Sequence, residues 1–337
     1  MDVIVCGAQV PYVRGGAELL QENLVAAIRA EGHRAELVRL PVGWEKGRIF
    51  DAPLAWRMIP LDCDLVITTN FPSYYARHGH KVSWLTHQHR GAYDAADAAW
   101  SDFGHDDISL ETQRMLGEWD NRALEEHSSI YTISQVVTDR LLRFNGIDSA
   151  PLYHPAPLHD QLHGGAYGDY VFSPTRLENN KRPQLTVEAL AHCDPSVRGI
   201  VAGRGSMLDE LTALADRKGL AERVDLAGFV SDERLVELYA DCLAVVYPPH
   251  DEDYGYVTLQ AFKAGKPVIT AKDSGGVLEW VEDGVNGFIT DGSPEAIGAA
   301  IDALARDRDL AARMGAAGLA RVADLSWRPV VETLLAG

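Results

Sequence analysis

The chain has 337 residues, which exceeds the length of one ordinary domain and predicts two. Its 46% hydrophobic and 24% charged residues are typical of a soluble globular protein with full cores. The net charge of −18 and the pI near 5.0 argue against nucleic acid or an anionic membrane surface as the main partner.

Cysteine usage and hydrophobic runs predict a cytoplasmic protein without a membrane segment. The four cysteines form no C-x-x-C pair and lie mostly in apolar, strand-like runs, as is typical of reduced, buried thiols. The first residues, MDVIVCG, indicate a strand rather than a signal peptide. No apolar run reaches the roughly 20 residues that a membrane helix needs.

The first half of the chain alternates short apolar runs with helical patterns. The stretch Ala17–Glu31 places Leu20, Leu24 and Ile28 on one face of a helix. The predicted strands of this half are Val3–Cys6, Ala35–Leu40, Asp64–Thr69, Lys81–Thr86 and Ile130–Ile133.

The second half repeats the same alternation, which predicts α/β domains with parallel sheets and helices on both faces. Its predicted strands are Tyr170–Ser173, Gly199–Ala202, Val224–Leu226, Leu243–Tyr247, Pro267–Thr270 and Gly287–Ile289. Its predicted helices are Pro183–His192, Ser206–Lys218, Asp232–Ala240, Val257–Ala264 and Pro294–Ala305.

A segment rich in Pro, Gly and His, His154–Tyr170, lacks apolar periodicity and predicts a linker. We therefore expect domains over 1–155 and 170–324, joined by residues 156–169. Residues 325–337 are expected to form a helix that packs back across the linker. Ligands of such sheets bind beyond the carboxyl ends of the strands, which predicts a site in the cleft between two facing domains.

The stretch Tyr247–Thr270 is the most informative in the sequence. It indicates a strand, an acidic loop, a glycine, a helix and a second strand. Glu252 lies before the helix and Gln260 within it. The amino end of a helix binds phosphate, and an adjacent acidic or amide side chain can hold sugar hydroxyls. These features suit a phosphorylated sugar.

The second half as a whole resembles the retaining glycosyltransferases of family 4. The resemblance rests on the ordered segments SPTRLENNK, VAGRGSMLDEL, VDLAGFVSDERLVELYADC, PPHDEDYGYVTLQAFKAGKPVI and SGGVLEWVEDGVNGFI. The first half is similar more loosely, through PYVRGGAE and WLTHQHR. The resemblance implies the GT-B fold, in which two Rossmann-like doubly wound domains face one another across a cleft.

The resemblance also implies roles for a cationic pair and a carboxylate. Arg176 and Lys181 match the family residues that contact the diphosphate, and Glu252 matches the one that contacts the transferred sugar. Fixed cations beside a leaving phosphate stabilise the charge that grows there. Two positions depart from the family pattern. Arg182 stands where glycine is usual. Gln260 replaces the glutamate that holds ribose hydroxyls and remains a donor-binding candidate, because an amide can still accept from one hydroxyl and donate to another.

Further donor contacts are expected around the predicted helix. Gly255 lets the backbone approach phosphate, and the N–H groups of the residues after it are directed towards the ligand. Leu208 occupies the position where a dinucleotide fingerprint needs its third glycine, so a Rossmann cofactor is excluded. The remaining donor-binding candidates are Gly203, Val230, Tyr254, Tyr256 and Val257.

In the first half, Gly15 and Gly16 open the first predicted helix. The resemblance implies that they approach the donor phosphates, while a plain helix start explains two glycines almost equally well. His87 follows a strand where the family often has a histidine near the reacting sugar, so it joins Glu252, Arg176 and Lys181 as a catalytic candidate. His89 and Arg90 are acceptor-binding candidates, and the alignment leaves open which histidine faces the sugar. No third ligand with metal-site spacing accompanies the two histidines, so no metal is expected.

The segment Gly91–Ser109 is polar, rich in small residues and long for a simple connection. Long ordered loops at strand ends often bind substrate. Tyr93 and Trp100 are therefore candidates for stacking on an acceptor sugar, while surface packing is an equal alternative.

The resemblance implies transfer of a hexose-type sugar, with retained configuration and without a metal or other cofactor. UDP is expected because uridine donors are the commonest in the family. A small-molecule or oligosaccharide acceptor fits the acidic surface better than a lipid does. Two alternatives remain: an epimerase of nucleotide-linked sugars with the same architecture, and a nucleotide-sugar-binding protein whose site has decayed at Gln260. The sequence does not indicate the oligomeric state.

Overall fold

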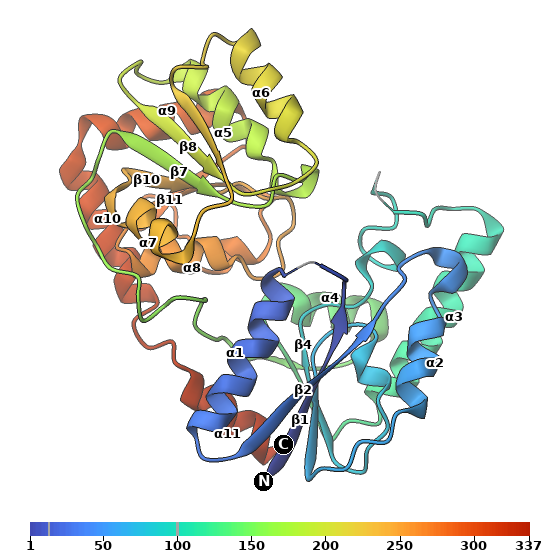
Figure 1. Ribbon diagram of the computed structural model, residues 1–337. Coiled ribbons are helices and arrows are strands. Elements are labelled where there is room, and N and C mark those ends of the chain that lie inside the picture. The colour runs from blue at the N-terminus through green and yellow to red at the C-terminus, as the bar shows by residue number, and fades with distance from the viewer. Residues whose placement is uncertain (13, 99–100) are drawn as a thin grey trace. The chain divides into compact units, whose positions relative to one another are not determined.

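The computed structural model describes residues 1–12, 14–98 and 101–337, which form two compact units (Figure 1). Unit 1 consists of Met1–His154 together with Ser326–Gly337, and unit 2 of Pro155–Leu325. Each unit is built around a six-stranded sheet in which all strand pairs are parallel. All the strands predicted from the sequence are present, with small displacements of their ends.

Unit 1 has the strand order β2-β1-β3-β4-β5-β6. Helices α1 and α2 pack on the sheet, and α11 packs against α1. The strands are β1 (Asp2–Gln9), β2 (Arg34–Pro41), β3 (Leu65–Thr68), β4 (Lys81–Leu85), β5 (Ser129–Thr132) and β6 (Ala150–Pro151). The helices are α1 (Gly16–Ala30), α2 (Asp51–Met58), α3 (Asp107–Leu124), α4 (Gln135–Asn145) and α11 (Trp327–Ala336).

Helix α11 is the last element of the chain, yet it belongs to unit 1. The Trp327 ring packs edge-on against Trp84, with 6.1 Å between centroids, and lies 5.6 Å from the His154 ring. Trp84 and His154 are fully buried, and Val330, Val331 and Leu334 line the buried face of the helix. These contacts attach the end of the chain to the sheet of unit 1.

Replacing Trp327 with alanine is expected to destabilise unit 1 by about 2–4 kcal/mol, because a large packed ring is removed from a site that cannot fully collapse. Urea unfolding of the variant checks this value. Leu319→Ala, at an exposed residue of unit 2, is the control and should leave stability nearly unchanged. Equal stability of Trp327→Ala and the wild type would show that α11 is only loosely attached.

Unit 2 has the strand order β12-β11-β10-β7-β8-β9, which is the doubly wound Rossmann order. Helices α5, α6 and α9 pack together, while α8 packs beside β10 and β11 and against α10. The strands are β7 (Tyr170–Pro174), β8 (Arg198–Ala202), β9 (Val224–Gly228), β10 (Ala244–Val246), β11 (Val268–Ala271) and β12 (Gly287–Thr290). The helices are α5 (Pro183–Ala189), α6 (Leu208–Arg217), α7 (Asp232–Asp241), α8 (Tyr256–Lys263), α9 (Pro294–Arg306) and α10 (Arg308–Arg321).

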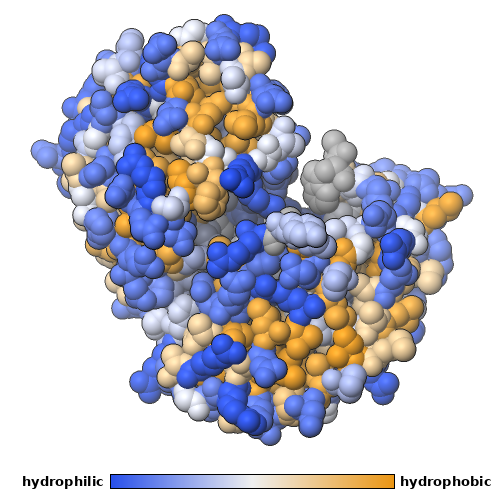
Figure 2. All heavy atoms as spheres, viewed as in Figure 1, coloured by the Kyte–Doolittle hydropathy of each residue, from blue (hydrophilic) through white to orange (hydrophobic). Residues whose placement is uncertain are grey.

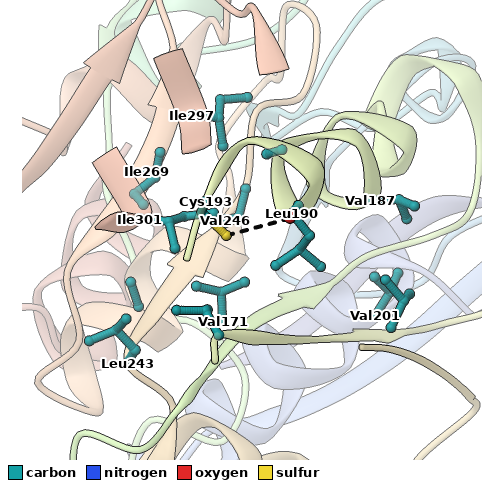
Figure 3. Close-up of a cluster of buried hydrophobic side chains, with 14 of the residues drawn as sticks. Val171, Val187, Leu190, Cys193, Val201, Leu243, Val246, Ile269, Ile297 and Ile301 are labelled. Carbon is teal, nitrogen blue, oxygen red and sulfur yellow. Dashed lines mark hydrogen bonds between the residues drawn. The ribbon is translucent and has the colours of Figure 1, made fainter. Parts of the chain in front are cut away.

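The core of unit 2 is a continuous layer of buried aliphatic side chains between the sheet and its helices. Figure 3 shows part of it, where Leu190 meets Val171 of β7 and where Ile297 and Ile301 of α9 approach Ile269 of β11. This burial is the main source of stability for the sheet, and it fixes the strand ends from which the loops emerge. The strand order reverses between β7 and β10, and the loops that follow the strands at such a point are where open α/β sheets bind ligands.

Helix α10 was not predicted, because its buried face consists mostly of small residues, with Met314 as its one large apolar side chain. A Cβ atom on Gly315 would lie 1.9 Å from the Gly265 carbonyl oxygen, and one on Gly318 would lie 2.3 Å from the Phe262 ring. The two glycines therefore let α10 approach α8 very closely. Such a contact leaves no hydrophobic periodicity in the sequence.

Hydrophilic residues cover most of the visible surface, with apolar side chains gathered in patches (Figure 2). Within the described residues, none of the helices combines the length and apolar character that crossing a membrane would require.

Candidate active site

The loop that follows β7 carries the predicted cationic pair. Leu177 is buried and anchors the loop, and its backbone N–H donates to the Arg204 carbonyl at 2.9 Å. Arg176, beside it, is exposed at the sheet edge. Lys181 ends a short 3-10 turn, Asn179–Lys181, and 11% of its side chain is exposed. The loop thus presents one guanidinium to solvent and one ammonium in a largely enclosed position.

Glu252 follows β10, the strand next to β7 in the sheet, and forms an ion pair with Lys181. The Tyr247 hydroxyl donates to the same carboxylate oxygen at 2.9 Å. Burial by itself raises the pKa of Glu252, but the charge and hydrogen bond of Lys181 outweigh it, so the pKa lies below its usual value. The carboxylate is therefore ionised at neutral pH.

Helix α8 begins directly after this loop. Gly255 is its N-cap and has a φ of +84°, a conformation that a residue with a side chain rarely adopts. Tyr256 and Val257 form the first turn of the helix, where the positive end of the helix dipole lies. Tyr254, just before the cap, is buried, and its ring packs edge-on against Trp280.

Two glycines bring the loop after β8 against the loop after β7. A Cβ atom on Gly203, whose φ is +148°, would lie 1.8 Å from the Thr175 carbonyl oxygen. A Cβ atom on Gly205 would lie 2.2 Å from the Leu177 carbonyl oxygen. The Gly203 N–H donates to the Gly228 carbonyl at 2.7 Å, which connects this loop to the end of β9 two residues before the partly exposed Val230.

Gln260 lies within α8 and is 8% exposed. Its Oε1 accepts from the Tyr239 hydroxyl at 3.0 Å, and its Nε2 donates to the Pro157 carbonyl at 3.1 Å. The first bond needs an acceptor and the second a donor, so an amide satisfies both, whereas a carboxylate cannot. The glutamine thus joins α8 to the segment that enters unit 2.

Gln260→Glu is therefore expected to destabilise unit 2 by about 1–3 kcal/mol, because an ionised oxygen would face the Pro157 carbonyl. Thermal unfolding at neutral pH measures the effect. Gln161→Glu, at an exposed position, adds the same charge without this contact and serves as the control. Unchanged stability with increased transfer activity would instead support a site that had decayed through the loss of a glutamate.

The catalytic candidate of unit 1, His87, follows β4 and is partly exposed. Its neighbours in the loop point elsewhere. Gln88 is fully buried and donates to the Asn145 side chain at 3.0 Å. His89 stacks on Trp44 with 5.5 Å between centroids, and burial and the nearby His87 lower its pKa to about 4. The loop is thus held by two side chains turned into the unit.

The acceptor-binding candidates Arg90 and Tyr93 both contact carboxylates of unit 1. Arg90 donates to Asp94 at 2.6 and 2.9 Å. The Tyr93 hydroxyl donates to Asp120 at 2.6 Å, within a buried cluster that also contains Tyr75. Burial raises the pKa of Asp120 to about 6, despite these hydrogen bonds. Trp100, the other stacking candidate, lies outside the described residues.

The glycine pair of unit 1 lies at the amino end of α1, after β1. Gly15 is the N-cap, and its N–H donates to the Glu18 side chain at 2.9 Å. Gly16 is the first residue of the helix. Among residues 1–12, 14–98 and 101–337, no group of three or more His, Cys, Asp or Glu is arranged to hold a metal ion.

In unit 2 the structure brings Arg176, Lys181, Glu252 and the amino end of α8 to one edge of the sheet, at the point where the strand order reverses. Two participants were not expected from the sequence. Tyr247 resembles an ordinary strand residue, and only the three-dimensional position of Glu252 shows its role. Arg182, next to Lys181, is marked in the sequence only by its departure from the usual glycine.

Residues 167–321 match the family described as glycosyl transferases group 1. The chain is 36% identical over 171 residues to the D-inositol 3-phosphate glycosyltransferase of Nocardia farcinica, a match that covers 48% of this chain and 38% of that protein. It is 33% identical over 168 residues to human alpha-1,3/1,6-mannosyltransferase ALG2, covering 45% of this chain and 40% of that protein. The matched region thus spans about two fifths of these relatives.

Solved structures cover nearly the whole chain. Anabaena HepE in complex with UDP-glucose has a TM-score of 0.77 at 20% identity and covers 100% of this chain and 98% of its own. Sucrose-phosphate synthase from Thermosynechococcus elongatus has a TM-score of 0.79 at 16% identity, with coverage of 99% and 97%. These likenesses confirm the GT-B fold predicted from the sequence.

Proposed function

Since residues 167–321 give this chain a glycosyl transferases group 1 domain, we propose that the protein is a retaining glycosyltransferase. It moves a hexose-type sugar from a nucleoside diphosphate to an acceptor hydroxyl without a metal ion. The observation that carries this proposal is the cluster of Lys181, Glu252 and Tyr247 beside the amino end of α8. An enclosed cation, an ionised carboxylate and the positive end of a helix dipole together suit a diphosphate joined to a sugar.

In the proposed reaction, the positive groups of the site act on the leaving diphosphate, and the carboxylate acts on the sugar. As the bond between the anomeric carbon and the phosphate oxygen breaks, its electron pair stays on the diphosphate. Arg176, Lys181 and the α8 N–H groups stabilise that charge. Glu252 holds the sugar, and His87 orients its reacting face. The acceptor oxygen bonds to the anomeric carbon on the face that the phosphate leaves, so the configuration is kept, and its proton passes to the departing phosphate.

The donor proposed is a uridine diphosphate sugar. HepE, which shares the fold, binds UDP-glucose. Gly203 and Val230 lie at the ends of β8 and β9, on the side of Arg176 away from Glu252 in the strand order, where the nucleoside of such a donor would extend. The proposed acceptor is a small molecule or an oligosaccharide, in keeping with the acidic protein surface. His89, Arg90 and Tyr93 are the proposed acceptor-side residues.

The test is a thermal-shift screen of nucleotide sugars, followed by mass spectrometry of the products formed from the best donor. Transfer of the sugar to an added acceptor, with the anomeric configuration kept, supports the proposal. Conversion of the donor sugar without an acceptor would indicate an epimerase. Binding of donors without any product would indicate a nucleotide-sugar-binding protein.

A further inference from the structure

Arg182 adopts a backbone conformation that is unfavourable for a residue with a side chain. It follows Lys181 and precedes Pro183 at the start of α5, with φ +50° and ψ +47°. In this left-handed region the Cβ atom crowds the backbone, so glycine is normally favoured. An arginine here must therefore gain enough from its side chain to offset the strain.

The Arg182 guanidinium makes four hydrogen bonds to two other loops. Nε donates to the Pro248 carbonyl and Nη2 to the Pro249 carbonyl, both at 2.7 Å. Nη1 and Nη2 donate to the two carboxylate oxygens of Asp273 at 2.9 and 2.6 Å. Its side chain is only 18% exposed, and its hydrogen bonds lower the pKa of Asp273. A planar fork of this kind fixes both the distance and the orientation of its partners.

The three loops joined in this way follow β7, β10 and β11, which are neighbours in the sheet. Backbone bonds run between the same loops. The His250 N–H donates to the Asn180 carbonyl at 2.8 Å, and the Asp251 N–H donates to the Asp273 carbonyl at 2.9 Å. The next residue is Glu252, whose carboxylate meets Lys181. Arg182 thus holds the loop that carries the carboxylate against the loop that carries the ammonium.

We propose that Arg182 is a positioning residue, whose guanidinium fork sets the Pro248–Asp251 loop so that Glu252 and Lys181 meet at the donor site. The effect of Arg182 on donor binding rests on the proposed function, whereas its effect on the position of the Pro248–Asp251 loop does not. Arg182 contacts no reacting atom in this role. It acts through Glu252 and Lys181. An asparagine or glutamine side chain at position 182 has only two N–H donors, so it could not replace the bonds of the guanidinium to both loops.

Two substitutions separate the side chain from the backbone. Arg182→Gly removes the fork and also the backbone strain, so general destabilisation is not the expected result. Arg182→Lys keeps the strain and the charge but offers a single ammonium in place of the planar fork. Arg306→Ala removes an exposed arginine that donates to Asp302 in α9 and is the matched control.

The first readout is hydrogen–deuterium exchange of the unliganded protein, which does not depend on any donor. In Arg182→Gly, peptides covering 248–253 and 273–276 should exchange at least about tenfold faster, while the rest of unit 2 keeps its protection. Arg182→Lys should give an intermediate rate, and Arg306→Ala the wild-type rate. Unchanged exchange in Arg182→Gly overturns the inference whether or not the protein binds a nucleotide.

The second readout is calorimetric titration with UDP. If the wild type binds UDP, Arg182→Gly should bind about tenfold more weakly, with partial recovery in Arg182→Lys and an unchanged melting temperature. Wild-type affinity in Arg182→Gly would overturn the positioning role. If the wild type binds neither UDP nor GDP nor ADP, the proposed function fails, and the exchange experiment alone decides the role of Arg182.

Discussion

Replacing Glu252 with glutamine is expected to lower sugar transfer by about a hundredfold to a thousandfold, while the protein stays folded. The amide keeps the shape of the side chain and can still accept hydrogen bonds from Lys181 and Tyr247. It loses the negative charge, which the lowered pKa of Glu252 shows to be present at neutral pH. The measurement is kcat/KM with the best donor found in the screen.

Glu252→Ala should lose at least as much activity and also some stability, because it leaves a largely enclosed ammonium without its partner. We expect a cost of about 1–3 kcal/mol from the unpaired Lys181. Glu222→Gln is the control, because it makes the same change of carboxylate to amide at an exposed loop position 30 residues before Glu252. Wild-type kcat/KM in Glu252→Gln would remove Glu252 from the reaction.

Acid is expected to destabilise unit 1 strongly between pH 6 and pH 4. Three histidines carry lowered pKa values in the folded protein. Burial and His87 lower that of His89 to about 4, burial and Lys81 lower that of His127 to about 3, and burial lowers that of His154 to about 3. The unfolded chain, with values near 6.5, binds these protons first, so stability is complete above pH 6.5 and falls as the pH decreases towards the folded values.

Asp120 opposes this trend. Burial raises its pKa to about 6, so the folded protein gains a proton below pH 6 that the unfolded chain binds only near pH 4. The unfolded chain then binds three protons where the folded protein binds one. The difference of two protons corresponds to a loss of about 2.7 kcal/mol per pH unit in the free energy of unfolding.

Urea unfolding at pH 7.5, 6 and 5, followed by tryptophan fluorescence, measures this loss. The signal reports mainly on unit 1, because every tryptophan of the sequence except Trp280 falls within its bounds. His154→Phe keeps an aromatic ring beside Trp84 and Trp327 and should reduce the slope by about 1.4 kcal/mol per pH unit. His163→Gln, at an exposed histidine, should leave it unchanged. A stability independent of pH over this range would contradict the burial of the three rings.

The fold could be predicted from the sequence because its main signals are local. Alternating apolar strands and amphipathic helices, such as α1, require only the spacing of large side chains to be recognised. Helix α10 lacks that spacing, since Gly315 and Gly318 form its contact with α8. Close packing through small residues depends on the surfaces of both helices, so the pattern within α10 alone does not reveal the contact with α8.

In the candidate site, too, the residues with local sequence signals could be predicted, and the contacts between distant residues could not. Glycine before a helix and an acidic residue after a strand marked Gly255 and Glu252, because a phosphorylated sugar needs such groups at those places. Lys181 was indicated only by the resemblance to the family 4 glycosyltransferases. The sequence could not show that Gln260 bonds Tyr239 and Pro157, since these partners lie 21 and 103 positions away. Arg182 was likewise visible only as a departure from glycine until its contacts with Pro248, Pro249 and Asp273 were known.

The most direct test is a crystal structure of the protein with UDP bound. We predict the β-phosphate within about 3 Å of Lys181 Nζ and of the N–H groups that begin α8, with Arg176 turned towards the same phosphate. UDP bound elsewhere, or absent at saturating concentration while Arg176 points to solvent and Lys181 keeps only its protein partner, would contradict a diphosphate site at this edge of unit 2.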